Sequence, residues 1–381
     1  MMLNILTIDL EDYFQVHAFS NVVRFEDWGN HESRIERNTH RLLEILRESG
    51  MAHSAERIAN ELTPNDSRLT PDVSDLSPEF VNSLPLTSNL KPQTSVRATF
   101  FILGWLAERY PHLIRTIKDQ GHEIANHGYA HKLIYTQTKE EFRNDIRKSK
   151  AILEDITGSE VIGYRAPSYS ITQKSRWALE ILMEEGFKYD SSIFPIHHDF
   201  YGFPQAPRFP FLISMNGNNN FEFSPLNFET AALQHNSTNV LPPTSNGVLL
   251  QPPTKVDSSN PTTSSKLIEF PISTLRICGQ NLPISGGGYF RLFPYPLIKK
   301  GLRRINEEEE RPFIFYIHPW EIDPDQPRIN SISRKSRFRH YVNLHKTESK
   351  FKKLLTDFRF SSLKNILKFN NIFVRIEEGM V

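Results

Sequence analysis

The chain has 381 residues, 38% of them hydrophobic and 23% charged, so it can bury a sizeable core and is not globally disordered. A formal net charge of +1 argues neither for nor against an anionic partner. We expect no nucleic-acid partner. The single cysteine, Cys278, excludes an internal disulfide and a cysteine-based metal cage.

The N-terminal sequence MMLNILTIDLEDYF carries acidic residues where a secretory signal peptide needs an apolar core behind basic residues. No run of the sequence reaches the roughly 20 apolar residues of a membrane span. We therefore expect a cytoplasmic protein without a transmembrane segment.

Short apolar runs alternate with amphipathic segments, which is typical of a mainly parallel sheet with crossover helices. The predicted strands are Leu3–Asp9, Arg97–Leu103, His122–Asn126, Val161–Arg165, Phe187–Asp190, Leu267–Phe270 and Phe313–His318. The predicted helices are Ile35–Ser49, Trp105–Asp119, Lys139–Ile156, Ser175–Glu185 and Leu297–Glu308. This alternation predicts an α/β fold, either an open sheet or a barrel, with the active site at the carboxyl ends of the strands.

Two long segments interrupt the alternation, at residues 51–96 and 214–265, and both lack a sustained hydrophobic period. Loops of this length are typical of flexible insertions. Residues 1–330 would then form one domain, with residues 331–381 as an extension packed on or following it. From Arg328 onward the chain has 13 Lys/Arg against 4 Asp/Glu. This basic segment could make a peripheral membrane contact, although a solvated basic face is the simpler interpretation.

Polar side chains capable of chemistry follow four of the predicted strands. They are Asp9, Glu11 and Asp12, then His127 and His131, then Arg165, Ser168 and Tyr169, and finally His318. Each group has an ordinary structural interpretation, such as a solvated turn, an ion pair or a core histidine. The carboxyl ends of parallel strands share one rim, however, so these groups can converge. A carboxylate with two imidazoles leaves coordination positions of a metal ion open for water and substrate.

The order of these motifs resembles that of the polysaccharide deacetylases with NodB homology, which form carbohydrate esterase family 4. Segments such as TIDLEDYFQV, GHEIANHGYAH and FYIHPWEIDP look most like a branch found with PEP-CTERM/exosortase exopolysaccharide loci. The resemblance implies a distorted (β/α) barrel with about seven parallel strands. It also implies a hydrolase that removes N-acetyl groups from an acetylated saccharide in exopolysaccharide biosynthesis.

The resemblance implies the following site. Asp9 would be the general base, Arg165 would orient it, and His318 would protonate the leaving amine. One divalent ion, expected to be zinc, would be held by Asp12, His127 and His131. The usual adjacent Asp-Asp pair is here Asp9-Leu10-Glu11-Asp12, so Glu11 is an alternative carboxylate ligand. The backbone N–H of Ser168, together with Tyr169, would serve substrate and oxyanion binding.

Two other functions fit the same residues. One is an allantoinase-like amidohydrolase that cleaves a small cyclic amide on the same scaffold. The other is a catalytically silent saccharide-binding module.

Overall fold

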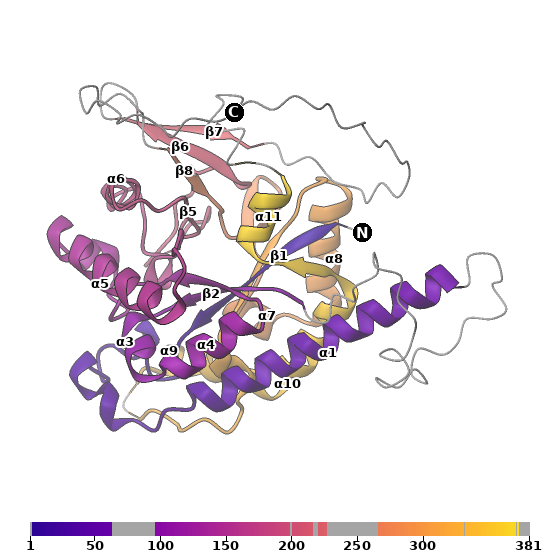
Figure 1. Ribbon diagram of the computed structural model, residues 1–381, viewed down its shortest axis with the longest axis horizontal. Coiled ribbons are helices and arrows are strands. Elements are labelled where there is room, and N and C mark those ends of the chain that lie inside the picture. Colours follow the sequence, from indigo (N-terminus) through magenta and orange to yellow (C-terminus); the bar gives the residue numbers. More distant parts are fainter. Residues whose placement is uncertain are drawn as a thin grey trace, which may run out of the picture.

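The computed structural model describes residues 2–62, 96–198, 200–215, 220–226, 266–330, 332–370 and 372. Its centre is a curved sheet surrounded by helices (Figure 1). Seven strands of this sheet are mutually parallel and follow the order β11-β1-β2-β3-β4-β5-β8. They are β1 (Leu3–Leu10), β2 (Thr99–Ile102), β3 (Glu123–Asn126), β4 (Gly163–Tyr164), β5 (Tyr189–Asp190), β8 (Lys266–Glu269) and β11 (Ile314–Ile317). All seven overlap the predicted strands.

The free edge of β11 is covered by the chain that follows β8. This chain contains the hairpin of β9 (Thr274–Ile277) and β10 (Gln280–Pro283). The Tyr316 N–H donates to the Ser285 carbonyl, and Gly286 forms a parallel bridge with Tyr316. A Cβ on Gly286 would lie 2.2 Å from the Tyr316 carbonyl oxygen, so glycine permits this close approach. The predicted distorted barrel with about seven parallel strands is therefore confirmed.

The helices cover the outside of the barrel. In chain order they are α1 (Ile35–Leu62), α3 (Gly104–Arg109), α4 (Pro111–Asp119), α5 (Lys139–Thr157), α6 (Trp177–Glu184), α7 (Gly287–Leu292), α8 (Tyr295–Glu307), α9 (Arg334–Tyr341), α10 (Leu344–Asp357) and α11 (Leu363–Phe369). Helices α1 and α10 run side by side along one outer surface, away from α5 and α6 (Figure 1). None of the helices that the structure describes combines the length and the hydrophobicity of a transmembrane span.

Two predicted helices have different limits in the structure. The predicted helix Trp105–Asp119 is divided into α3 and α4 at Tyr110 (φ −125°, ψ 52°). Pro111 causes this break because its ring disfavours a helical conformation in the preceding residue. Helix α1 continues to Leu62, past Gly50, where we expected its end. A glycine inside a helix costs only about 1 kcal/mol, and helix formers follow it.

The two segments predicted as insertions are described only in part. Residues 51–62 belong to α1, and residues 63–95 lie outside the described residues. In the second segment, β6 (Phe211–Met215) and β7 (Phe221–Pro225) form an antiparallel pair that joins the sheet through β8. Residues 216–219 and 227–265 lie outside the described part of the chain. The flexibility expected for both segments stays a prediction.

The segment after residue 330 contributes to the main sheet. Its strand β12 (Arg359–Ser361) pairs in parallel with the first residues of β1, and Leu3 lies opposite Arg359. The N–H of Leu363 then donates to the Thr99 hydroxyl of β2. Strand β12 thus pairs with β1 from Leu3 to Ile5, and β2 pairs with β1 from Thr7 onward.

The alternation of side chains along β1 separates the interior of the barrel from its outer core. Leu6, Ile8 and Leu10 are fully buried in the cluster beneath the helices, whereas Ile5 belongs to the interior cluster. Residues two apart lie on the same face of a strand. Thr7 and Asp9 therefore face the interior with Ile5, and Asp9 is the last of the three toward the carboxyl end.

Candidate active site

The polar groups predicted from the sequence meet at the carboxyl-terminal rim of the barrel. Two groups of buried ligand atoms form there, Glu11 with His127 and His131, and Asp9 with Glu11 and His318. Within each group the ligand atoms lie within 4.8 Å of one another. Since Glu11 belongs to both groups, the two form one continuous site.

Glu11 and the two histidines have the geometry of a metal site. The Glu11 Oε1 atom lies 3.0 Å from Nε2 of His127 and 3.1 Å from Nε2 of His131. The His127 Nδ1 atom lies 2.7 Å from the Arg165 carbonyl oxygen. A carbonyl only accepts, so Nδ1 carries the hydrogen and the Nε2 lone pair of neutral His127 faces the carboxylate. Two acceptors facing each other require a proton or a cation between them.

His131 supports the same interpretation. Its Nε2 atom is buried and makes no hydrogen bond within the described structure, although it lies beside the Glu11 carboxylate. A buried polar atom without a partner is costly. One carboxylate and two imidazoles suit zinc or a similar divalent ion, and the backbone carbonyl that holds His127 is a usual partner of a metal-binding histidine. The residues present therefore fit a divalent cation.

Asp12, our preferred carboxylate ligand, does not belong to this group. Its Oδ2 accepts hydrogen bonds from the Ser33 hydroxyl (2.7 Å) and the Arg34 N–H (2.9 Å), and its Oδ1 accepts from the Tyr13 N–H (3.0 Å). Asp12 thus secures the chain before α1. Because side chains alternate along extended chain, Glu11 faces the interior together with Asp9, whereas Asp12 turns outward.

Asp9 is held by a fully buried arginine. Arg165 Nη1 donates to Asp9 Oδ1 at 2.6 Å and to the Thr7 hydroxyl at 2.8 Å. Its Nε donates to the Ser191 carbonyl, and its Nη2 to the Ser191 hydroxyl. The guanidinium therefore has a fixed orientation and balances the Asp9 charge. Burial alone would lower the pKa of Arg165, but the neighbouring Asp9 carboxylate raises it above the usual value.

His318 lies across the site from Asp9. Its Nε2 atom is 3.8 Å from Asp9 Oδ2 and 3.9 Å from Glu11 Oε1, too far for hydrogen bonds. Its Nδ1 contacts Glu321 Oε1 at 2.6 Å, and Glu321 Oε2 accepts from Arg291 Nε at 2.7 Å. Burial tends to lower the pKa of His318, but the charges of Glu11, Glu321 and Asp9 outweigh it and raise the pKa to about 9.

The turn after β4 provides two further polar groups. Ser168 and Tyr169 have positive φ values of 51° and 54°. The N–H groups of Tyr169 and Ser170 donate to Ala166 and Pro167, which leaves the Ser168 N–H as the donor of this turn without a carbonyl partner in the described structure. The Tyr169 hydroxyl is buried and also lacks a partner there. Strained backbone of this kind is common at functional sites.

Some functional contacts had only a weak sequence signal. Glu321 follows His318 by three residues and its carboxylate accepts from the His318 N–H, which is a capping-box spacing. Ser191, which holds Arg165, comes directly after a predicted strand. Thr7 lies two residues before Asp9 on the same strand, so the two side chains are expected on the same face. For Arg291 the local sequence gives no such indication.

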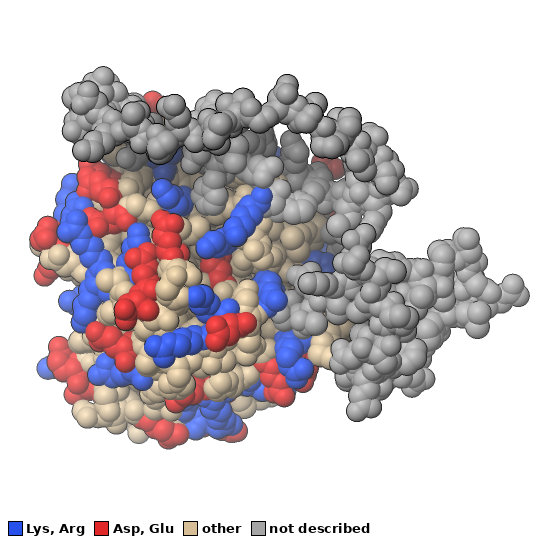
Figure 2. Space-filling view, viewed as in Figure 1, with Lys and Arg blue, Asp and Glu red and all other residues tan. Residues whose placement is uncertain are grey.

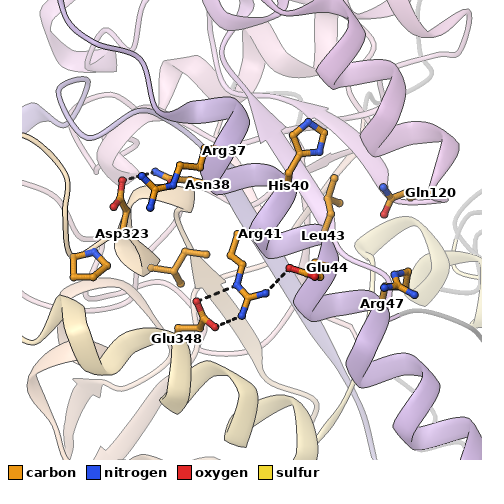
Figure 3. Close-up of a pocket in the computed structure, with 12 residues that line it drawn as sticks. Arg37, Asn38, His40, Arg41, Leu43, Glu44, Arg47, Gln120, Asp323 and Glu348 are labelled. Carbon is orange, nitrogen blue, oxygen red and sulfur yellow. Dashed lines mark hydrogen bonds and ion pairs between the residues drawn. The ribbon is translucent and has the colours of Figure 1, made fainter. Parts of the chain in front are cut away.

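A cavity of about 650 Å³ lies outside this site, between α1, the 3₁₀ helix η6 (Pro319–Ile322) and α10 (Figure 3). Arg41 in its wall forms ion pairs with Glu44 and Glu348, and Asn38 donates to Asp323. None of the candidate metal or acid–base residues lines this cavity. We assign this cavity no catalytic part.

Behind Arg165, two buried carboxyl groups lie opposite each other. Asp190 of β5 and Glu269 of β8 are register partners and are fully buried. Asp190 Oδ1 accepts from Ser192, and Glu269 Oε1 accepts from the Ile193 N–H, while Asp190 Oδ2 and Glu269 Oε2 have no protein donor. Burial raises the pKa of Asp190 to about 6 and that of Glu269 well above its usual value. The pair therefore shares a proton near neutral pH.

This pair predicts a pH-dependent stability. Because the folded-state pKa values are raised, the stabilisation is complete below pH about 4 and is lost as the pH rises through about 6. In Glu269→Gln the amide donates permanently to Asp190. We expect the fall in unfolding free energy between pH 5 and pH 8 to be smaller by roughly 1–3 kcal/mol than in the wild type.

Urea unfolding at both pH values measures this difference, with the exposed Glu160→Gln as the matched control. A pH dependence identical in Glu269→Gln and wild type would show that the pair does not share a proton.

Comparison with known proteins gives two family-model matches. Residues 86–184 match the polysaccharide deacetylase family model, and residues 241–368 match a domain of unknown function, DUF3473. Within residues 86–184 the chain is therefore similar to polysaccharide deacetylases. This segment includes His127, His131, Arg165, Ser168 and Tyr169.

Two curated relatives illustrate the similarity. A peptidoglycan-N-acetylglucosamine deacetylase from Bacillus cereus is 37% identical over 89 residues, which cover 23% of this chain and 32% of the relative. A peptidoglycan deacetylase from Helicobacter pylori is 32% identical over 117 residues, which cover 31% of this chain and 38% of the relative. The matched segments thus span less than half of the relatives' own lengths.

Among solved structures, a polysaccharide-deacetylase-like protein from Mycobacterium smegmatis aligns with a TM-score of 0.46 and 14% identity. The alignment covers 98% of this chain and 92% of that protein.

Proposed function

We propose that this protein is a hydrolase that removes N-acetyl groups from a saccharide, using one divalent cation held by Glu11, His127 and His131. The observation that carries this proposal is the approach of the Nε2 atoms of His127 and His131 to Glu11 Oε1, beside an acid–base pair. Deacetylation of saccharides is supported by the names of the curated relatives, which include a chitooligosaccharide deacetylase from Azorhizobium caulinodans that is 30% identical over 99 residues.

The cation, which we propose to be zinc, would supply Lewis-acid polarisation of a water molecule and of the acetyl carbonyl. Glu11, the alternative in the sequence analysis, replaces Asp12 as the proposed carboxylate ligand. We replace Asp12 because its carboxylate already accepts hydrogen bonds from Ser33, Arg34 and Tyr13.

Asp9 and His318 would divide the proton transfers. Asp9 Oδ2 accepts a proton from the attacking water, since Arg165 engages Oδ1 and leaves Oδ2 facing His318. His318 Nε2 donates a proton to the leaving nitrogen, while Glu321 holds Nδ1. The gap of 3.8 Å between these two groups allows reacting atoms to contact both.

The developing oxyanion needs donors close to the carbonyl. The Ser168 N–H and the Tyr169 hydroxyl are the available donors on the turn after β4. Preorganised donors of this kind stabilise the transition state more than the ground state. We propose that both contact the acetyl oxygen.

The biological setting is a further part of the proposal. The motif resemblance supports a part in exopolysaccharide biosynthesis, and we propose that the protein acts in the cytoplasm. Subcellular fractionation of cells that produce the protein tests the second point.

The proposed activity is tested by acetate release from N-acetylglucosamine oligomers, with allantoin ring opening measured in parallel. His318→Ala should reduce acetate release from the amide by about 10²–10⁴-fold, but affect an activated aryl acetate far less, because that leaving group needs no proton. The exposed His345→Ala is the matched control. Equal losses on both substrates would remove His318 from the acid role. Saccharide binding without hydrolysis by the wild type would indicate a binding module.

A further inference from the structure

One stretch of the surface has cations without acids. Over the described part of the face in Figure 2, Lys/Arg and Asp/Glu residues are interspersed. Between Gln326 and Thr347, by contrast, the chain has six Lys or Arg residues and no Asp or Glu. Four of the six are on α9, namely Arg334, Lys335, Arg337 and Arg339, and all four are exposed. Within the described structure, the ion pairs are formed by other Lys and Arg residues and not by these six.

An exposed aromatic side chain lies among these cations. Phe338 is 58% exposed, whereas His340 is buried and Ser336 is half-buried. At 100° per residue, Ser336 and His340 mark the face of α9 that packs on the protein. Phe338, midway between them in sequence, points to the opposite side. Arg334 and Lys335, one turn earlier, flank it on that outer face.

Helix α9 is anchored close to the candidate active site. His340 and Tyr341 contact Phe19 of the 3₁₀ helix η1 (His17–Phe19), with ring centroids 4.5 and 6.3 Å apart. Helix η1 follows the loop that carries Glu11. On another side, Arg339 lies close enough to Tyr201 to act on its hydroxyl electrostatically. Helix α9 therefore lies beside the rim on which the proposed site opens, with its outer face directed to solvent.

We propose that the outer face of α9 docks on an anionic lipid membrane, with Phe338 inserted among the acyl chains and the surrounding cations on lipid phosphates. Cations around an apolar side chain are the combination that anionic bilayers bind. A soluble polyanion would be attracted by the charges but gives no reason for a phenyl ring directed into solvent. The docking would bring the rim of the site toward the membrane.

This orientation suits a saccharide carried by a membrane lipid. That extension rests on the proposed function, whereas the docking itself can be measured without any substrate. Failure of the deacetylase assay would leave the proposed docking unaffected. Failure of vesicle binding would leave the proposed deacetylase activity unaffected.

Cosedimentation of the full chain with vesicles tests the docking. Vesicles of phosphatidylcholine that contain about 30% phosphatidylglycerol, a strongly anionic composition, should bind the protein. Vesicles of pure phosphatidylcholine should not. Each cation should contribute about fivefold in affinity, so the fourfold variant R334Q/K335Q/R337Q/R339Q should bind at least about 100-fold more weakly. Phe338→Ala should lose about tenfold, and high salt should weaken wild-type binding.

The matched control is K300Q/R303Q, which removes exposed cations from α8. The carboxyl-terminal end of α8 lies beside the start of β1, since Asn306 bonds to Asn4, at the opposite end of the strands. Circular dichroism establishes that each variant is folded. Equal binding by the fourfold variant and the control would overturn the proposal. The proposal would also be overturned if the protein bound heparin as tightly as vesicles and Phe338→Ala did not change the heparin binding.

Discussion

Glu11→Gln should abolish tight binding of a divalent cation, whereas Asp12→Asn should preserve it. Glu11 Oε1 is the atom that both Nε2 atoms approach, and an amide oxygen carries no charge to balance the ion. Loss of an outer partner of a metal ligand already costs 10–100-fold in affinity. We therefore expect a loss of more than about 100-fold for Glu11→Gln, measured by metal analysis of purified protein and by calorimetric titration.

Asp12→Asn is the matched control because it is the same chemical change one residue away. It weakens the hydrogen bonds to Ser33 and Arg34, so it should cost about 1–2 kcal/mol of stability with full metal content. The double variant His127→Ala, His131→Ala should hold no ion. Metal loss in Asp12→Asn with retention in Glu11→Gln would reverse the ligand assignment.

Asp9→Asn should lower kcat by about 10²–10⁴-fold, the usual contribution of a general base, and leave the metal content unchanged. Asparagine keeps an oxygen for Arg165 but cannot accept the proton from water. Steady-state acetate release and metal analysis on the same preparation measure both quantities, with the exposed Asp155→Asn as control.

A second variant separates catalysis from folding. Arg165 is fully buried, and removal of the charge of its partner can destabilise the chain. Asp9→Glu keeps the negative charge but moves the carboxylate by one methylene. It should remain folded and still lose most of the activity, because proton transfer depends on position. Wild-type activity in either variant would exclude Asp9 as the base.

The period of the first strand already distinguishes Glu11 from Asp12 as the proposed metal carboxylate. Asp9 and Glu11 are two residues apart at the end of a strand, and a period of two places them on the same face. The resemblance to the deacetylases implied Asp12 as the ligand instead. Its actual partners, Ser33 and Arg34, lie 21 and 22 residues further along the chain, and no local pattern announces such a contact.

The helices show the same division between local and distant effects. The capping box from Thr138 to Glu141 and the left-handed Gly158 delimit α5 within one residue of the predicted range Lys139–Ile156, because these signals act within a few residues. The break at Tyr110 is also encoded locally, by Pro111, although we predicted one continuous helix there. The pairing of β12 with β1 joins residues more than 350 positions apart, and its short sequence has no period by which a strand could be recognised.

By itself, the sequence determined the seven parallel strands, their alternation with helices and the chemical types at the rim. Each depends on the period of apolar residues or on short motifs, which a single chain displays directly. Only the tertiary structure decided which acid meets His127 and His131, which groups hold Arg165, and that Arg291 binds Glu321 behind His318. These contacts form between segments brought together by barrel closure, and their distances depend on strand register and packing.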